Sequence, residues 1–324
     1  MEFIIQDSET RKIYDISEIA ESVSYSSERQ NGASRLTFSY LNDGLFFSNG
    51  SVVRFKYNGA NIFYGYIRES EVDENNLIKV TAYDQLRYLK AKDTKFIKGY
   101  TADMLIKEIA KDLQLRCGNI ENTGYVLPND ILDNKTLLDM IYDCLSQTLV
   151  ATNKKFILYD SFGSISLKEG NNLKLPIVLG DESFVYGYRY SKSIDGETYN
   201  KIKLAQDDKK ASTRENYIVE DSSNINKWGI LQYYEKVDEK LNSAQIIEKA
   251  SQLLKLYNAE EKKFSLKALG DVRVRGGSGI MVKISDLKID GWFMVESVTH
   301  DFSKKIHTMD LELVLIWWVN ILKR

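Results

Sequence analysis

Gly50-Ser51-Val52-Val53-Arg54-Phe55-Lys56 and Gly279-Ile280-Met281-Val282-Lys283-Ile284 open alike, although they lie far apart in the chain. The first is followed by Asn58-Gly59 and an aromatic run at 62–67, the second by Asp290-Gly291 and the run 292–298. Alternation of apolar with polar residues is typical of half-buried β-strands, and Asn-Gly or Asp-Gly is a strong signal for a two-residue hairpin turn. The two stretches therefore predict two hairpins of one kind, which turn at Asn58-Gly59 and at Asp290-Gly291.

Both hairpins are followed by a polar loop and an alternating strand, at 77–83 and at 308–315. We interpret this as two copies of one antiparallel β module, although any two hairpins share some resemblance. Two similar modules in each chain would let three chains close into a ring of six modules. Such a ring follows the cyclic symmetry usual for identical chains, and it would cover exposed sheet edges.

The sequence between the two modules has a different period. Apolar residues recur at helical spacing over 101–113 and after Thr136, where Asp139 occupies the capping-box position. A hairpin is expected at 155–159 and 164–167. Later in the chain, a polar stretch at about 206–226 is expected to be an exposed loop, and a third helix is expected to begin near Asn242-Ser243.

These patterns predict an α+β fold that is mainly β. We expect a first β domain at 1–93, a small α+β domain at 94–178 and a second β domain at 179–324. The second β domain would carry a helical insertion at about 207–262. A length of 324 residues fits two or three domains of ordinary size.

Composition narrows the class of protein. A formal net charge of −2 argues against a dedicated nucleic-acid binder, which usually carries a clear basic excess. The start of the chain lacks the basic and apolar regions of a signal peptide, and the apolar run 313–319 is too short to cross a bilayer as a helix. Cys117 and Cys144 are expected to be reduced and buried, with a disulfide or a metal pair as the alternative.

Motifs for chemistry are incomplete. His300-Asp301 could form a base and its orienting carboxylate, but a strand-end histidine with a hydrogen-bond partner is the simpler interpretation. A metal site on His300 and His307 lacks further ligands at a usual spacing. The glycines at 276–279 precede a strand and lack the Gly-Lys-Ser/Thr of a phosphate loop, so a tight turn is expected there.

Acidic residues gather at the end of one predicted strand, at Glu69, Glu71, Asp73 and Glu74. Paired carboxylates can hydrolyse glycosides, yet solvated charges are common at strand ends. We therefore predict no catalytic, cofactor-binding or metal-binding residues in this chain.

The last residues are strongly apolar. Trp317, Trp318 and Ile321 are candidate interface residues, because aromatic patches mark interfaces between subunits. Packing of these residues into the protein's own core is the alternative.

Nearly the whole chain resembles the XkdQ-like proteins of PBSX-type prophages and contractile bacteriocins, relatives of the phage baseplate hub and of the VgrG hub domain. The order and spacing of several segments carry the resemblance, at 49–53, 63–67, 80–86, 135–140, 199–202, 228–232, 269–271, 298–302 and 307–309. The resemblance implies two tail-tube-like β-barrel or sandwich domains per chain and a homotrimer that forms a pseudo-six-fold ring. That ring would join a hexameric tail tube to a trimeric central spike among other baseplate proteins.

The expected place is a baseplate in a virion or phage-tail-like particle, assembled in the bacterial cytoplasm, without membrane insertion or sequence-specific nucleic-acid binding. A tail-associated cell-wall hydrolase is the alternative, and it would depend on Glu69, Glu71 or His300. A pore-forming or nucleic-acid-guiding channel is a further alternative, which the charge of the trimer's lumen would decide.

Overall fold

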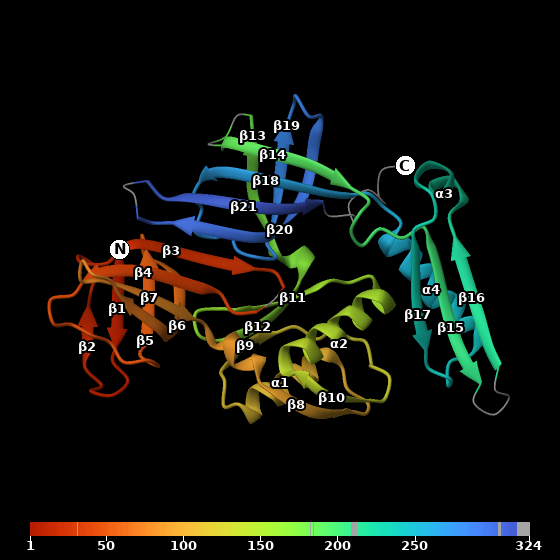
Figure 1. The fold of residues 1–324 in the computed structure, drawn as a ribbon, viewed down its shortest axis with the longest axis horizontal. Coiled ribbons are helices and arrows are strands. Elements are labelled where there is room, and N and C mark those ends of the chain that lie inside the picture. The colour runs from red at the N-terminus through yellow and green to blue at the C-terminus, as the bar shows by residue number, and fades with distance from the viewer. Residues whose placement is uncertain (31, 182, 184, 209–212, 304–305, 316–324) are drawn as a thin grey trace.

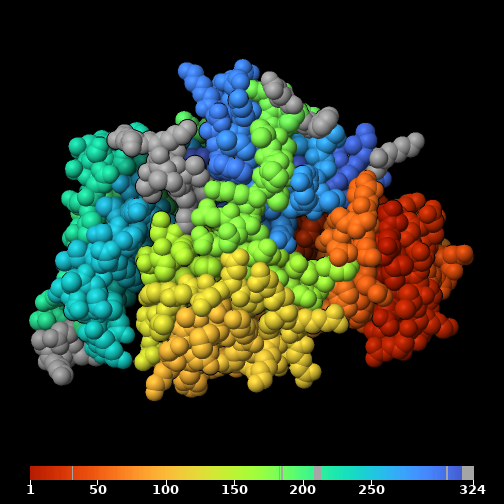
Figure 2. All heavy atoms as spheres, turned by 180° about the vertical axis from the view of Figure 1, so that it is seen from behind, coloured from red at the N-terminus to blue at the C-terminus, as the bar shows by residue number. Residues whose placement is uncertain are grey.

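The computed structural model describes residues 1–324 except 31, 182, 184, 209–212, 304–305 and 316–324. One β module lies above the other, a mixed domain packs below the upper module and beside the lower one, and a small α/β unit extends to one side (Figure 1). From behind, the mixed domain fills the space between the first module and the α/β unit (Figure 2). We call these parts module 1, module 2, the middle domain and the insertion.

Module 1 is an antiparallel sheet in the order β2-β1-β5-β6-β7-β4-β3. The φ angles of 48° at Asn58 and 77° at Gly59 confirm the predicted two-residue turn between β5 and β6. Apolar side chains on alternate strand positions form its core, including Phe3, Phe38 and Phe55. Its strands are β1 (Glu2–Gln6), β2 (Ile13–Asp15), β3 (Glu21–Glu28), β4 (Arg35–Leu41), β5 (Val52–Tyr57), β6 (Ala60–Val72) and β7 (Leu77–Tyr83).

Module 2 has the order β13-β19-β20-β21-β18-β14. The turn predicted at Asp290-Gly291 is wrong, because these residues pair with Lys283 and Val282 inside the sheet. The chain reverses earlier, at 285–288, where Lys288 has a φ of 52°. The strands are β13 (Lys174–Gly180), β14 (Val185–Ser193), β18 (Glu261–Leu269), β19 (Gly279–Ile284), β20 (Ile289–Asp301) and β21 (Thr308–Leu315).

The strand pairing supports the internal repeat. The order β5-β6-β7-β4-β3 in module 1 matches the order β19-β20-β21-β18-β14 in module 2. β6 and β20 both have 13 residues, and each has a bulge, at Arg68 and at Glu296. The residues before the bulges also match, since Gly50 donates to the carbonyl of Ile67 and Gly277 to that of Val295, both at 2.8 Å. A bulge at the same place in each copy is not expected of two unrelated hairpins.

The copies differ at one edge. β1 runs antiparallel to β5, whereas β13 runs parallel to β19. The repeat therefore covers five strands closely and diverges at the sixth.

The middle domain packs α1 and α2 on short strands around a separate apolar cluster. Thr136 accepts a hydrogen bond from the backbone of Asp139, which confirms the predicted start of α2. The predicted hairpin is also confirmed, as β11 and β12. The elements are β8 (Lys92–Ile97), α1 (Ala102–Asp112), β9 (Cys117–Ile120), β10 (Asp130–Thr136), α2 (Leu137–Thr152), β11 (Phe156–Asp160) and β12 (Ile165–Glu169), with 3₁₀ turns at Gln85–Lys90 and Gly170–Leu173.

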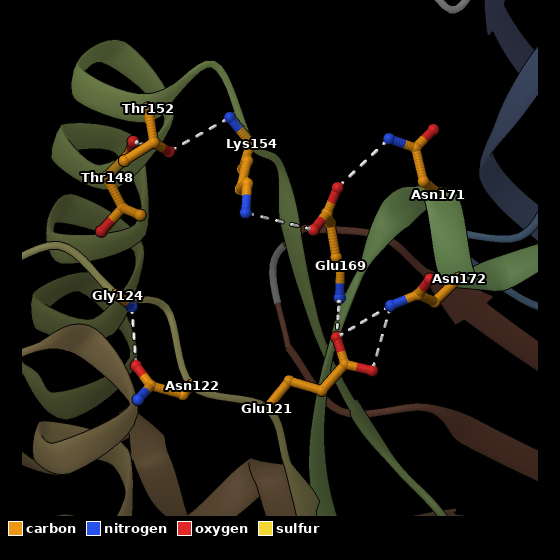
Figure 3. A network of polar contacts seen from close by, with 9 residues as sticks. All are labelled: Glu121, Asn122, Gly124, Thr148, Thr152, Lys154, Glu169, Asn171 and Asn172. Atoms are coloured by element: carbon orange, nitrogen blue, oxygen red, sulfur yellow. Dashed lines mark hydrogen bonds and ion pairs between the residues drawn. The ribbon is translucent and has the colours of Figure 1, made fainter.

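Polar contacts fix the exit from the middle domain into β13 (Figure 3). The Glu121 carboxylate accepts the backbone N–H of Glu169 at 2.7 Å and the amide of Asn172 at 3.2 and 3.3 Å. The Glu169 carboxylate lies 4.0 Å from the Lys154 ammonium and accepts from Asn171 at 3.2 Å. β9, β12 and the end of α2 are thereby tied to the turn that leads into module 2.

The insertion contains strands as well as helices. The prediction of a loop at about 206–226 is wrong, because β16 and α3 lie there. The expected helical insertion contains a three-stranded sheet in the order β16-β15-β17, with α4 packed on it. Asn242 forms a capping box with Gln245, which confirms the predicted start of α4. The elements are β15 (Lys201–Asp208), β16 (Thr213–Glu220), α3 (Ser222–Trp228), β17 (Gln232–Val237) and α4 (Ser243–Tyr257).

The predicted fold class is confirmed, since the chain is mainly β with large antiparallel sheets and few helices. The division at 93/94 and 178/179 stays a prediction. Trp317, Trp318 and Ile321 lie outside the described residues.

Candidate assembly interface

The two modules are joined edge to edge within the chain. The second half of β20 pairs antiparallel with β3, so that both modules contribute to one 13-stranded sheet among the described residues. The facing pairs are Ser297–Glu28, Val298–Ser27, Thr299–Ser26, His300–Tyr25 and Asp301–Ser24. We call this the internal joint.

Backbone and side-chain contacts extend the internal joint at both ends. The N–H of Arg29 donates to the carbonyl of Glu296 at 2.8 Å, and the N–H of Phe302 donates to that of Val23 at 2.9 Å. The Arg29 guanidinium also donates to both carboxylate oxygens of Glu296, at 2.7 and 2.9 Å. A two-pronged pair of this kind fixes orientation as well as adding attraction.

The glycine-rich stretch at 276–279 belongs to the same joint. The N–H of Gly276 donates to the Ser27 hydroxyl at 2.9 Å. A Cβ at Gly276 would lie 2.4 Å from the backbone carbon of Glu28, which is closer than side-chain carbons approach. The glycine therefore allows the two backbones to approach each other this closely.

Aromatic packing makes the internal joint apolar. Phe302 follows β20 yet belongs to the core cluster of module 1, with its ring 5.1 Å from Phe55 and 4.9 Å from Tyr57. The His300 and Tyr25 rings stack at 5.9 Å. Module 2 thus completes the core of module 1.

The two histidines are buried and hydrogen-bonded to each other. His300 donates from Nε2 to the carbonyl of Val274 at 2.9 Å, so its Nδ1 accepts from Nε2 of His307, also at 2.9 Å. Burial lowers the pKa of His300 to about 4. A neutral His300 with both ring nitrogens engaged in this way is poorly placed to act as a general base.

A cleft of about 310 Å³ opens where module 1, module 2 and the middle domain meet. Two of its charged side chains, Arg273 and Asp160, already have partners. Arg273 pairs with Asp271 at 2.6 Å, and Asp160 accepts from Gln85 at 2.8 Å. Burial raises the pKa of Asp160, and burial together with the charge of Asp160 raises the pKa of Asp84. We interpret the cleft as a junction between domains.

The structure does not bring the candidate hydrolase residues together. Glu69 and Glu71 are exposed on the outer half of β6, whereas His300 is buried in the internal joint. Cys144 is buried as expected, but Cys117 is exposed on β9, and both thiols are free.

Within the described residues, no group of three or more histidine, cysteine, aspartate or glutamate side chains could hold a metal ion. No helix in the same residues is long and apolar enough to cross a membrane.

The sequence pattern did not identify three residues of the internal joint, namely Arg29, Glu296 and Phe302. Arg29 and Glu296 are 267 positions apart. Nothing local in the chain marks them as partners.

The comparisons with known proteins agree with this architecture. The model of the YqbQ-like family matches residues 23–314. YqbQ of Bacillus subtilis strain 168 is 32% identical over 320 residues, which cover 96% of this chain and 95% of that protein. The phage-like element PBSX protein XkdQ of the same strain is 30% identical over 320 residues, with 96% of each chain covered.

A solved structure shares the fold at low sequence identity. The 43 kDa tail protein of prophage MuSo2 from Shewanella oneidensis aligns with a TM-score of 0.72 at 12% identity, over 97% of this chain and 98% of that one. The family match and the two relatives cover nearly the whole sequence. This chain therefore belongs to the YqbQ-like family.

Proposed function

We propose that this chain is a structural subunit of a contractile, phage-like tail. In this proposal it is the baseplate hub, and three copies form a pseudo-six-fold ring between the hexameric tail tube and the trimeric central spike. The tube protein, the spike and other baseplate proteins are its partners. It is assembled in the bacterial cytoplasm and then resides in the particle.

The internal joint is the observation that carries this proposal. Two copies of one module are joined edge to edge, through β3 and β20, in a continuous sheet. A joint that links like modules head to tail can repeat from chain to chain, and such contacts form rings when the rotation closes. Three chains then present six similar modules to a six-fold partner.

The relatives support the same class of protein. XkdQ is named as a protein of the phage-like element PBSX, and the MuSo2 protein is named as a tail protein. We carry the tail role over to this chain as a proposal, with surfaces as its contribution and no catalysis. The interface role of Trp317, Trp318 and Ile321 stays part of this proposal.

A reconstruction of the tail from the producing cells tests the proposal. We expect three copies of this chain in one ring at the end of the tail tube, above the spike. A reconstruction that has six copies, or one, or that places the chain away from the tube would contradict the hub role. A zymogram with the folded protein tests the absence of catalysis, and a clear zone lost in a Glu71→Gln variant would favour the hydrolase instead.

A further inference from the structure

The repeat gives a residue-by-residue correspondence between the modules. The bulges align Ile67 with Val295, and their partners Ala82 and Leu313 then align on β7 and β21. Leu36 of β4 pairs with Ala82, and Phe264 of β18 pairs with Leu313, so Leu36 and Phe264 also align. On the next strands, Tyr25 of β3 pairs with Leu36 and Tyr190 of β14 pairs with Phe264. Tyr25 therefore aligns with Tyr190.

Each of the two strands that form the internal joint has a counterpart in the other module whose edge lacks a partner strand among the described residues. Residues 68–72 of β6 correspond to the half of β20 that pairs with β3, yet among the described strands this half pairs with β7 alone. Every residue in it is exposed. β14 corresponds to β3, and its one strand neighbour among the described residues is β18. The open edge of β6 in module 1 therefore corresponds to the β20 side of the internal joint, and the open edge of β14 in module 2 corresponds to its β3 side.

The register of the internal joint can be transferred to the two open edges. His300 faces Tyr25 there, so Val72 would face Tyr190. Continuing along both strands gives the pairs Glu69–Ser193, Ser70–Lys192, Glu71–Ser191 and Asp73–Arg189.

The side chains of the transferred register are chemically complementary. Val72 is 50% exposed and would cover Tyr190, the counterpart of the stacked His300 and Tyr25. On the opposite face of the sheet, Arg189 would lie directly across from Asp73 and diagonally from Glu71, both within reach in an antiparallel pair. The acidic end of β6 thus meets the basic strand β14, which also carries Lys192.

We propose that residues 69–73 of one copy pair antiparallel with residues 189–193 of a second copy of this chain. This seam rests on the proposed ring, and it names which edges form the ring. The contact is head to tail, because each chain offers β6 to one neighbour and β14 to the other. The acidic cluster is then an assembly surface, and the same pairing covers two edges that would otherwise invite wrong partners.

Disulfide trapping tests the seam in assembled particles. Val72→Cys and Tyr190→Cys are placed together in a chain that also carries Cys117→Ser, and tails are purified and oxidised. We expect a covalent trimer on a non-reducing gel, because facing residues in an antiparallel pair lie close enough for a disulfide. The matched control combines Val72→Cys with Arg189→Cys, one position away on the opposite face, and should give monomer.

The outcomes separate the seam from the ring. Three copies per particle with no cross-link, or with equal cross-linking in the control, would overturn the seam and leave the proposed function standing. Particles that hold this chain without a three-copy ring would overturn both.

A charge exchange provides a second test, in case the cysteine variants do not fold. Asp73→Arg and Arg189→Glu should each weaken association between copies by about tenfold or more, because like charges then lie directly across from each other in the seam. The double variant should restore association. Failure of the double variant to recover, while both single variants remain folded, would overturn the seam.

Discussion

Phe302→Ala tests whether the internal joint unites the two modules. Phe302 is 7% exposed, and its ring packs against Phe55, Tyr57 and His307, with centroid distances of 5.1, 4.9 and 4.3 Å. Truncating a buried phenylalanine costs about 3–5 kcal/mol in transfer and cavity terms. That is a large share of the roughly 5–15 kcal/mol by which natural domains are stable.

Hydrogen exchange followed by mass spectrometry locates the effect. We expect faster exchange in peptides that contain β3 and β20, because Phe302 belongs to module 2 but packs in the core of module 1. Peptides from α4 in the insertion should be unchanged. Phe46→Ala is the control, since this phenylalanine is 60% exposed. Unchanged exchange in β3 in the Phe302→Ala variant would refute the coupling of the modules through this ring.

Other predictions concern the same joint. In a denaturant titration, Gly276→Ala should lower the free energy of unfolding by about 1–3 kcal/mol, because the added Cβ overpacks against Glu28. Gly291→Ala is the control and should be near neutral, because no atom lies within 4 Å of its added Cβ. Arg29→Met should lower the free energy of unfolding by about 1 kcal/mol, since the ion pair with Glu296 is partly exposed. A double-mutant cycle with Glu296→Gln should show coupling between the two side chains. Additive effects of the two substitutions would contradict the pair. His300 has a folded pKa of about 4 against an ordinary 6.5, so the unfolded chain takes up the proton first and stability should fall by up to about 3 kcal/mol as pH drops from 6.5 to 4. A His300→Leu variant should lose that part of the pH dependence, and an unchanged pH profile would contradict it.

Local signals explain which elements could be predicted. Asn58-Gly59 has the two positive φ angles of its turn, and Thr136 and Asn242 cap the helices that follow them. These features depend on neighbours within a few residues, so the sequence states them directly. Asp290-Gly291 carries a similar signal, but four residues at 285–288 already reverse the chain and leave this pair inside β20.

The rest depends on contacts between distant residues. β16 looks like a polar loop because most of its side chains are exposed, and it is a strand because β15 supplies a partner for its backbone. The internal joint pairs residues 24–28 with 297–301, and a period of two says nothing about which strand lies at which edge. The repeat could be recognised from the sequence, whereas the edge that joins its copies required the structure.

The internal joint and the seam differ in a way that follows from chain connectivity. Modules within one chain meet at a high effective concentration, and their shared surface is never presented to solvent in the folded protein, so that surface can be aromatic and permanent. A strand edge that pairs with another copy is exposed to solvent before assembly, so it must not attract other strands. The charges of Glu69, Glu71 and Arg189 serve that purpose as well as recognition. Two similar modules in one chain therefore allow the same kind of edge contact to be permanent within the chain and to form only on assembly between chains.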